Sequence, residues 1–491
     1  MQKELFRLII DGAEVDSQSG ATAQIHNPAR VNEIVGSFSL GAVEDAKKAI
    51  DVAYDAYEKW SETTPRARSQ LLFRAAELLA QSEAEMAELL TREQGKTYPE
   101  SLNEVRLTAS VFKYYAGLAP TISGRKVELA DPTEFGLVFK QPMGVVVAIA
   151  PWNSPVILMA VKLAPALAAG NTIIAKPASS TPLADLLMCE LVNKAGFPSG
   201  VLNLVTGRGN EIGEELVSNR KVSKVAFTGE TETGKTVMSI ASRGIKRVSL
   251  ELGGSDPMII CDDADLDRAI EAALVSRFRN CGQVCMSVKR LYVQDSKYNV
   301  FLDRIAERIK KITVGDGLKK ESKMGPLHSS NQKQKIQGQL SDALEKGANL
   351  IYGGREPTES ELSQGYFYYP TLVTDVDQNS KLIQEEVFGP VLPIFKFSTI
   401  GEAIDLANDS PYGLGSSIWT KDLDLAMTAA SKIIAGTTWI NSFHEPQIDL
   451  PFGGLKESGL GKEMAIEGLE NYLETKAVVV NSKGKKRVWL D

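Results

Sequence analysis

The chain has 491 residues, of which 43% are hydrophobic and 24% charged, and its formal net charge is −7. This length exceeds what one hydrophobic core supports and predicts roughly two to four globular domains. The acidic balance disfavours nonspecific binding of nucleic acid, because such binding depends on Lys and Arg side chains that neutralise phosphates.

Several features favour a cytoplasmic protein without a membrane span or a metal. The N-terminal stretch lacks an apolar run of signal-peptide length. The long uncharged segment 141–161 is interrupted by "APWNSP" (150–155), which predicts a strand, a turn and a helix. Four cysteines make no disulfide framework in a chain this long. Cys281 and Cys285 are close together, but no histidine is near them, so we expect no zinc site.

Hydrophobic periodicity predicts two amphipathic helices, over 41–60 and 68–95, the second of which ends at a glycine. From residue 144 onwards, helix-length segments separate the short apolar runs "GVVVAIA", "NTIIAKP", "GVLNLVTG", "KVAFTG" and "VSLELGG". This alternation predicts a parallel sheet with helices on both faces and a ligand crevice at the strand ends. A second α/β region follows from about 255 to 450, with strands in "RLYVQD", "PTLVTDV", "LPIFKF" and "GTTWINS". The fold class is therefore α/β.

Three residues near these strand ends could carry chemistry. Cys285 in "NCGQVCMSVKR" becomes a nucleophile if its surroundings favour the thiolate, although a lone cysteine is more often a small buried hydrophobe. Glu251 in "SLELGG" could be a general base with a pKa raised by burial, or it could cap local N–H groups. Asn153 could donate to an oxyanion, or it could simply shape the turn between two prolines.

Taken together with their surroundings, these positions resemble the NAD(P)-dependent aldehyde dehydrogenase superfamily. The resemblance extends over nearly the whole chain. Eight motifs follow the family's order: "PWNSP", "KLAPALAAGNTIIAKPASSTP", "AGFPSGVLNLVTGRG", "FTGETETG", "VSLELGG", "GQVC", "EEVFGPV" and "PFGGLKESGLG".

The resemblance implies a domain layout. It places a Rossmann-like dinucleotide-binding domain at 1–118 and 142–253, and a second α/β domain, the catalytic one, at 254–450. Small bridging strands for oligomerisation would cover 119–141 and 470–487. A homodimer or homotetramer is the implied assembly.

The mechanism implied by the resemblance is a two-stage oxidation. The thiolate of Cys285 attacks the aldehyde, while Asn153 and the backbone N–H of Cys285 hold the oxyanion. Hydride passes to the nicotinamide and leaves a thioester on the cysteine. Glu251 then activates a water that releases the carboxylic acid.

The family's cofactor contacts also map onto this chain. Lys176 matches a contact to the adenosine ribose, and Glu386 and Phe388 match contacts to the nicotinamide ribose. The further cofactor positions are Trp152, Ser179, Arg208, Gly209, Gly213, Thr228, Gly229, Glu230 and Leu252.

Two of these positions indicate which cofactor the protein prefers. NAD-preferring members often carry a glutamate where this chain has Ser179, and that carboxylate repels a 2′-phosphate. Ser179 avoids this repulsion, and Arg208 could attract the 2′-phosphate. The two residues predict NADP as the preferred cofactor and NAD as a second one. Glu230 departs from the family's usual serine, and its carboxylate is unfavourable near a pyrophosphate unless it points away.

The substrate positions indicate a small polar aldehyde, such as glyceraldehyde or a semialdehyde. Ser154 and Val161 stand where aromatic residues often line the family's tunnel. Arg279 matches one carboxylate-binding arginine of succinate-semialdehyde members, whose other arginine falls at Val161, and it could equally be a surface ion pair. Val284 stands where members that use phosphorylated glyceraldehyde can carry arginine.

Three alternatives stay open on the sequence. A coenzyme A-acylating dehydrogenase would generally lack the glutamate at position 251, and a catalytically inert binding protein would not need Cys285. The stretch "GETETGKT" (229–236) fits the phosphate-loop pattern of nucleotide hydrolases. Two glutamates inside that loop would repel a triphosphate, and we therefore interpret it as the turn after a cofactor-domain strand.

Overall fold

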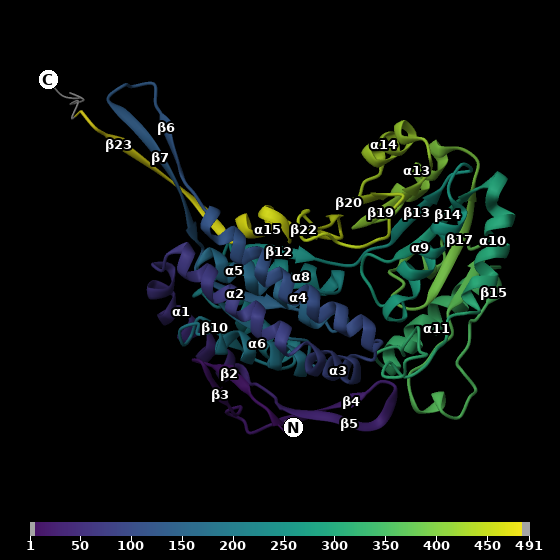
Figure 1. Ribbon diagram of the computed structural model, residues 1–491, viewed down its shortest axis with the longest axis horizontal. Coiled ribbons are helices and arrows are strands. Elements are labelled where there is room, and N and C mark those ends of the chain that lie inside the picture. The colour runs from purple at the N-terminus through teal and green to yellow at the C-terminus, as the bar shows by residue number, and fades with distance from the viewer. Residues whose placement is uncertain (1–4, 484–491) are drawn as a thin grey trace.

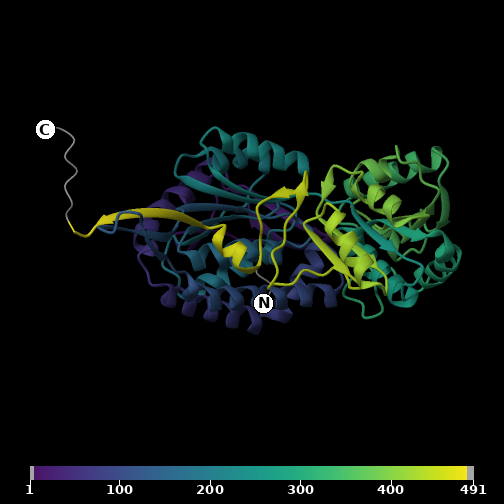
Figure 2. The ribbon, with the colours of Figure 1, turned by 90° about the horizontal axis from the view of Figure 1, so that it is seen from above.

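The computed structural model describes residues 5–483, in which two sheets with mostly parallel strands lie side by side (Figures 1 and 2). The first sheet has the strand order β22-β12-β11-β8-β9-β10-β2-β3. Its five central strands are parallel: β8 (Val145–Ile149), β9 (Thr172–Lys176), β10 (Leu202–Leu204), β11 (Val222–Thr228) and β12 (Arg247–Glu251). The predicted α/β class and its first set of strands are confirmed.

Antiparallel strands extend both edges of this sheet. They are β2 (Leu8–Ile10), β3 (Ala13–Val15) and β22 (Gly459–Leu460). The strand β22 brings a segment from the end of the chain beside β12, where it pairs with Glu251. A separate small sheet is formed by β1 (Leu5–Phe6), β4 (Thr22–Asn27) and β5 (Arg30–Ser39).

Helices cover both faces of the first sheet because its strands alternate their side chains between two apolar cores. One face carries α1 (Val43–Ser61), α7 (Gly209–Ser218) and α8 (Thr231–Ser242). The other carries α2 (Pro65–Gln81), α3 (Glu83–Gln94), α4 (Tyr98–Leu118), α5 (Pro155–Ala169) and α6 (Leu183–Lys194). The expected single helix over 68–95 is wrong, because the chain breaks into two helices at Ser82.

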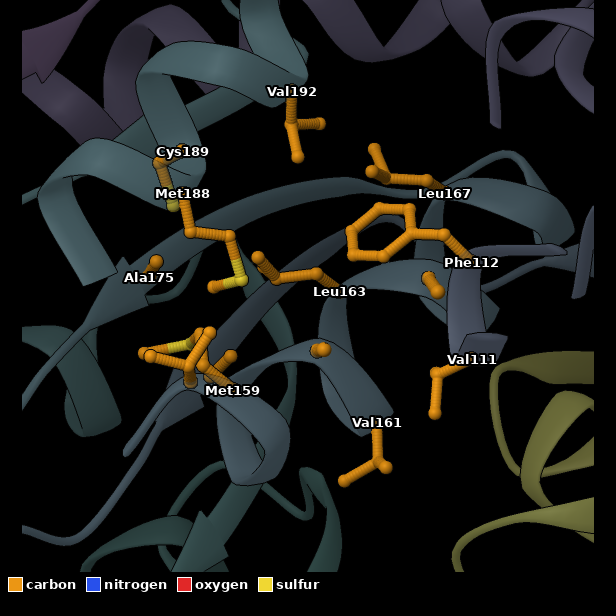
Figure 3. Close-up of a cluster of buried hydrophobic side chains, with 14 of the residues drawn as sticks. Val111, Phe112, Met159, Val161, Leu163, Leu167, Ala175, Met188, Cys189 and Val192 are labelled. Carbon is orange, nitrogen blue, oxygen red and sulfur yellow. The ribbon is translucent and has the colours of Figure 1, made fainter. Parts of the chain in front are cut away.

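The core beneath α4, α5 and α6 is closely packed (Figure 3). Phe112 of α4 and Leu163 of α5 meet Met188 of α6 above Ala175 of β9, and all four residues are fully buried. This core supports the helix that begins directly after Asn153, and so it fixes one side of the site described below.

The second sheet has the order β15-β16-β17-β14-β13-β19-β20 and is parallel except for β15. Its strands are β13 (Asp256–Ile260), β14 (Val288–Gln294), β15 (Asn349–Tyr352), β16 (Thr371–Thr374), β17 (Val391–Phe397), β19 (Gly415–Trp419) and β20 (Thr437–Ile440). The predicted boundary at 253/254 falls between β12 of the first sheet and β13 of the second.

Helices also cover both faces of the second sheet. One core contains α9 (Leu266–Phe278), α10 (Asp295–Ile309) and α11 (Ser330–Glu345), followed by the short α12 (Lys381–Gln384). The other contains α13 (Ile400–Asn408) and α14 (Leu423–Lys432). The short strands β18 (Tyr412–Gly413) and β21 (Leu455–Lys456) pair with each other near the junction between the two sheets.

A three-stranded arm projects from the body of the molecule (Figures 1 and 2). It contains β6 (Arg125–Glu128), β7 (Glu134–Pro142) and β23 (Leu473–Asn481), and α15 (Ala465–Glu470) leads into it. The predicted bridging segments 119–141 and 470–487 include these strands, although residues 484–487 lie outside the described part of the chain.

Within residues 5–483, no helix combines the length and apolarity needed to cross a bilayer. The same residues contain no group of three or more His, Cys, Asp or Glu side chains able to hold a metal ion.

The core of Figure 3 gives a direct stability prediction. We expect Phe112→Ala to lower the free energy of unfolding by about 3–5 kcal/mol, because it leaves a cavity at a fully buried position. Phe73→Ala on α2, where the side chain is 43% exposed, is the matched control and should cost far less. Urea titration of both variants measures the difference, and equal midpoints would contradict this packing.

Candidate active site

Two cavities meet between the sheets, at the carboxyl ends of β8, β11 and β12. The first, of about 180 Å³, is lined by the predicted cofactor residues Trp152, Thr228, Gly229, Glu230, Leu252, Glu386 and Phe388. The second, of about 350 Å³, has mainly apolar walls. Both cavities are lined by Asn153 and Cys285, so these two residues stand where the cavities join.

A left-handed turn presents Cys285 at this junction. Asn280 and Cys281 have φ values of 49° and 55°, and Gly282 has a φ of 74°. A side chain at Gly282 would place its Cβ only 2.4 Å from the carbonyl oxygen of Gly389, so only glycine fits there. The motif "NCGQVC" therefore encodes a close backbone turn, and Cys281 is a buried part of it.

Asn153 is held by the same turn. Its Nδ2 donates to the carbonyl oxygen of Gln283 at 2.9 Å, and its own carbonyl oxygen accepts from Asn280 Nδ2 at 2.9 Å and from Lys96 Nζ at 2.7 Å. A primary amide carries two N–H groups, so one N–H of Asn153 remains to stabilise an oxyanion beside Cys285.

Glu251 ends β12 and lines the larger cavity, with 4% of its surface exposed. Burial raises the pKa of its carboxyl well above the ordinary value, and the neighbouring Glu463 adds to this effect. Lys162 and Lys462 act in the opposite direction. Lys162 is itself fully buried and paired with Glu463 at 2.6 Å, and it also donates to Thr228 Oγ1. These surroundings therefore favour the protonated form of the Glu251 carboxyl on balance.

The thiol of Cys285 also has a perturbed pKa. Burial raises it to about 12; Lys289 lowers it, whereas Glu386, Asp256 and Glu251 raise it further. Burial therefore favours the protonated forms of both the Cys285 thiol and the Glu251 carboxyl.

The residues predicted to bind the adenosine half lie around the ends of β9 and β10. Lys176 is buried, with its Nζ 3.3 Å from the carbonyl oxygen of Pro177, and burial lowers its pKa to about 8. Ser179 Oγ donates to the carbonyl oxygen of Gly207 at 2.8 Å. A side chain at Gly209 or Gly213 would meet no atom within 4 Å, so open space lies beside the start of α7.

These features fit a dinucleotide. The N-termini of α7 and α8 carry unpaired N–H groups that suit a pyrophosphate. The buried ammonium of Lys176 is available to ribose hydroxyls, and Trp152, Glu386 and Phe388 line the cavity next to Cys285.

Two predicted cofactor residues have their own charged partners. Arg208 begins α7 with a side chain that is 66% exposed and pairs with Glu211 at 3.2 Å. Glu230 is 67% exposed, and its carboxylate lies 3.9 Å from Lys335 of α11. The Glu230 carboxylate thus turns toward a cation on the rim of the cavity.

The phosphate-loop alternative does not fit this geometry. Lys235 pairs with Glu232 at 2.9 Å and with Glu457 at 3.0 Å. Thr236 Oγ1 donates to the carbonyl oxygen of Glu232 within α8. Neither side chain is directed at a phosphate-sized site, so the match in "GETETGKT" is coincidental.

The substrate positions do not all reach the larger cavity. Ser154 and Val284 line it, and Arg279 stands at its rim with Nη1 4.0 Å from Glu445 Oε1. Val161 lies instead in the core of Figure 3, with 1% of its surface exposed. Its side chain is directed into the helix packing and not into the cavity.

The sequence reading missed several residues that the fold brings to the site. Gln332 and Lys335 of α11 line the smaller cavity, and Lys162 and Lys289 are buried cations beside it. Lys162 stands in the apolar run of α5, and this position could have indicated a buried ion pair, since buried lysines need a partner. No sequence signal identified that partner.

Comparison with known proteins identifies relatives over almost the whole chain. Residues 15–478 match the Aldehyde dehydrogenase family. The chain is 40% identical to betaine aldehyde dehydrogenase of Bacillus subtilis over 486 residues, covering 99% of each chain. It is 39% identical to the NADP(+) succinate-semialdehyde dehydrogenase of Escherichia coli over 478 residues, covering 97% and 98%. The crystal structure of betaine aldehyde dehydrogenase from Staphylococcus aureus in complex with NAD+ superposes with a TM-score of 0.97 at 38% identity, covering 99% and 97%.

The geometry predicts which thiol reacts. We expect iodoacetamide to modify Cys285 alone in the native protein, because it faces the cavities while Cys189, Cys261 and Cys281 are buried. Peptide mass mapping should show one alkylated cysteine per chain before denaturation and four afterwards. Cys285→Ala should abolish the native reaction; faster labelling of Cys281 would contradict the arrangement.

Proposed function

Because this chain belongs to the aldehyde dehydrogenase family and oxidises an aldehyde to the carboxylic acid with NAD(P), we propose that Cys285, Asn153 and Glu251 carry the reaction. The main support is the position of Cys285 where two cavities meet, with Asn153 beside it. One cavity suits the cofactor and the other suits the aldehyde, and Glu251 lines the aldehyde side.

In this mechanism the Cys285 thiolate attacks the aldehyde carbon. The oxyanion that forms accepts hydrogen bonds from Asn153 Nδ2 and from the backbone N–H of Cys285. The nicotinamide cofactor, when bound, supplies the hydride acceptor for the oxidation. Glu251 then takes a proton from a water molecule that attacks the thioester on Cys285, and the carboxylic acid leaves.

Glu251 also distinguishes this reaction from transfer to coenzyme A. A buried carboxyl with a raised pKa is suited to the work of a general base once it is deprotonated. Since its base form grows as the pH rises, we expect the rate of thioester hydrolysis to increase with pH through the raised pKa.

Glu251→Gln separates the two stages. We expect acylation to continue, which gives a burst of reduced cofactor of at most one equivalent per chain, while steady-state turnover falls by about 10²–10⁴-fold. Stopped-flow absorbance at 340 nm measures both phases. Cys285→Ala is the control and should show neither. Full turnover by the Glu251→Gln variant would rule out its role as the base.

Ser179 supports NADP as the preferred cofactor, with NAD as a second one. Ser179 follows Lys176 by three residues, and its hydroxyl offers no carboxylate that would repel a 2′-phosphate. Arg208 is exposed nearby, and its present partner Glu211 would compete with that phosphate. Relatives include both a protein named for NADP(+) and one solved with NAD+.

Ser179→Glu tests this preference. We expect kcat/KM for NADP to fall by about 10–100-fold, since like charges about 4 Å apart repel by a few kcal/mol in a partly solvated site. The value for NAD should change little. Ser179→Gln is the matched control, because glutamine has nearly the same size as glutamate but carries no charge. Equal losses in the two variants would point to steric exclusion and not to charge.

For the substrate we propose a small polar aldehyde or a semialdehyde. The larger cavity has apolar walls and ends at Arg279, whose present partner Glu445 is solvent-exposed. A substrate carboxylate could take the place of Glu445 on the guanidinium. This would hold the aldehyde end at Cys285.

We further propose a homodimer or homotetramer that joins through the arm of β6, β7 and β23. Its exposed side chains include Val127, Phe139 and Val479, which are 37%, 44% and 64% exposed. Apolar side chains on a projecting ribbon favour pairing with a second copy.

All four cysteines are free thiols, which supports a reducing, cytoplasmic setting.

A further inference from the structure

A buried lysine lies behind the nucleophile. Lys289 is the second residue of β14 and has no exposed surface. Its Nζ donates to the carbonyl oxygens of Cys285 and Val284, the latter at 3.1 Å, and to Glu386 Oε1 at 3.2 Å. An ammonium group has three N–H donors, so these three acceptors satisfy it completely.

These bonds join two parts of the site that are far apart in the chain. Glu386 Oε1 also accepts from the backbone N–H of Gly254 at 3.1 Å, which fixes the carboxylate from a second side. A Cβ at Gly253 would lie 2.6 Å from Glu386 Oε2, and a Cβ at Gly254 would lie 2.8 Å from the carbonyl oxygen of Cys285. The two glycines thus let the backbone close against this arrangement.

Lys289 is also the cation among several acidic groups. The charged and titratable groups that act on the Cys285 thiol are Lys289 from β14, Glu386 after α12, Asp256 from β13 and Glu251 from β12. Burial raises the pKa of Asp256 to about 7. His444, whose Nδ1–H donates to the carbonyl oxygen of Met286, has a pKa lowered to about 4 by burial and is therefore neutral. Lys162 and Lys462 act on Glu251 instead.

We propose that Lys289 is a positioning residue that ties the Cys285 loop to Glu386 and supplies the positive charge that favours the Cys285 thiolate. The inference rests on the proposed function, in which Cys285 is the nucleophile and Glu386 contacts the cofactor. The Lys289 side chain thus holds the backbone of Cys285 in place. It also orients the carboxylate of Glu386, the residue proposed to contact the cofactor. A lysine that merely filled the core would stabilise the fold without affecting the reactivity of the thiol.

The test measures the alkylation of Cys285 by iodoacetamide from pH 6 to 10 in the cofactor-free enzyme. Lys289→Met removes the charge and the hydrogen bonds, and Lys289→Gln keeps a neutral donor. The matched control is Lys224→Met, since Lys224 of β11 is also fully buried but bonds Asn471 away from the thiol. All variants are compared with wild type for gel-filtration elution and thermal midpoint.

We expect both Lys289 variants to alkylate about tenfold more slowly throughout this pH range, which corresponds to an upward shift of about one unit in the pKa of the thiol. KM for NAD(P) should rise as well, because Glu386 loses one of its two anchors. Lys224→Met should lower only the thermal midpoint. If Lys289→Met and Lys289→Gln give the wild-type alkylation profile, the inference is overturned.

Glu386→Gln covers the case in which the Lys289 variants do not fold. It keeps the ammonium and removes a carboxylate, so alkylation of Cys285 should become faster throughout the same pH range. An unchanged or slower reaction would overturn the inference. If Cys285 of the wild-type protein is not selectively alkylated at all, the proposed function itself fails, which separates the two outcomes.

Discussion

The reciprocal hydrogen bonds between Asn153 and the turn before Cys285 are the constraint on which this site depends. Asn153 follows β8 of the first sheet, whereas the turn precedes β14 of the second. The amide of Asn153 donates to Gln283, and the amide of Asn280 donates back to Asn153. Each bond crosses between the two sheets, so Asn153 and Cys285 come into register only when both sheets are folded and packed together.

Buried ion pairs surround this junction. Lys96–Glu104, Lys162–Glu463 and Lys289–Glu386 each join elements that packing alone would not align. Burying such pairs has a large desolvation cost, and their contribution to stability is small or negative relative to apolar residues. Lys289 acts on the Cys285 thiol, and Lys162 acts on the Glu251 carboxyl. They place fixed charges beside groups whose pKa values burial has raised.

The proposed cofactor and substrate positions lie mostly in different parts of the site. Ser179, which follows β9, is not among the residues that line the larger cavity. The rim around Arg279 and Glu445 is likewise separate from the cofactor residues. Relatives with the same fold but different named aldehydes and cofactors are consistent with this division, since local changes on either side leave Cys285 in place.

The sequence by itself determined the strand pattern, the α/β class and the family, because buried parallel strands are continuous apolar runs and the motifs keep their order. It also identified Cys285, Glu251 and Asn153 as candidates. Only the tertiary structure decided which side chains meet. The break at Ser82, the burial of Val161 and the partners of Glu230 and Lys289 all depend on helix rotation or on contacts between residues distant in the chain. A local sequence pattern shows the hydrophobic periodicity that indicates a helix or a strand. It does not show which residues elsewhere in the chain pack against that element.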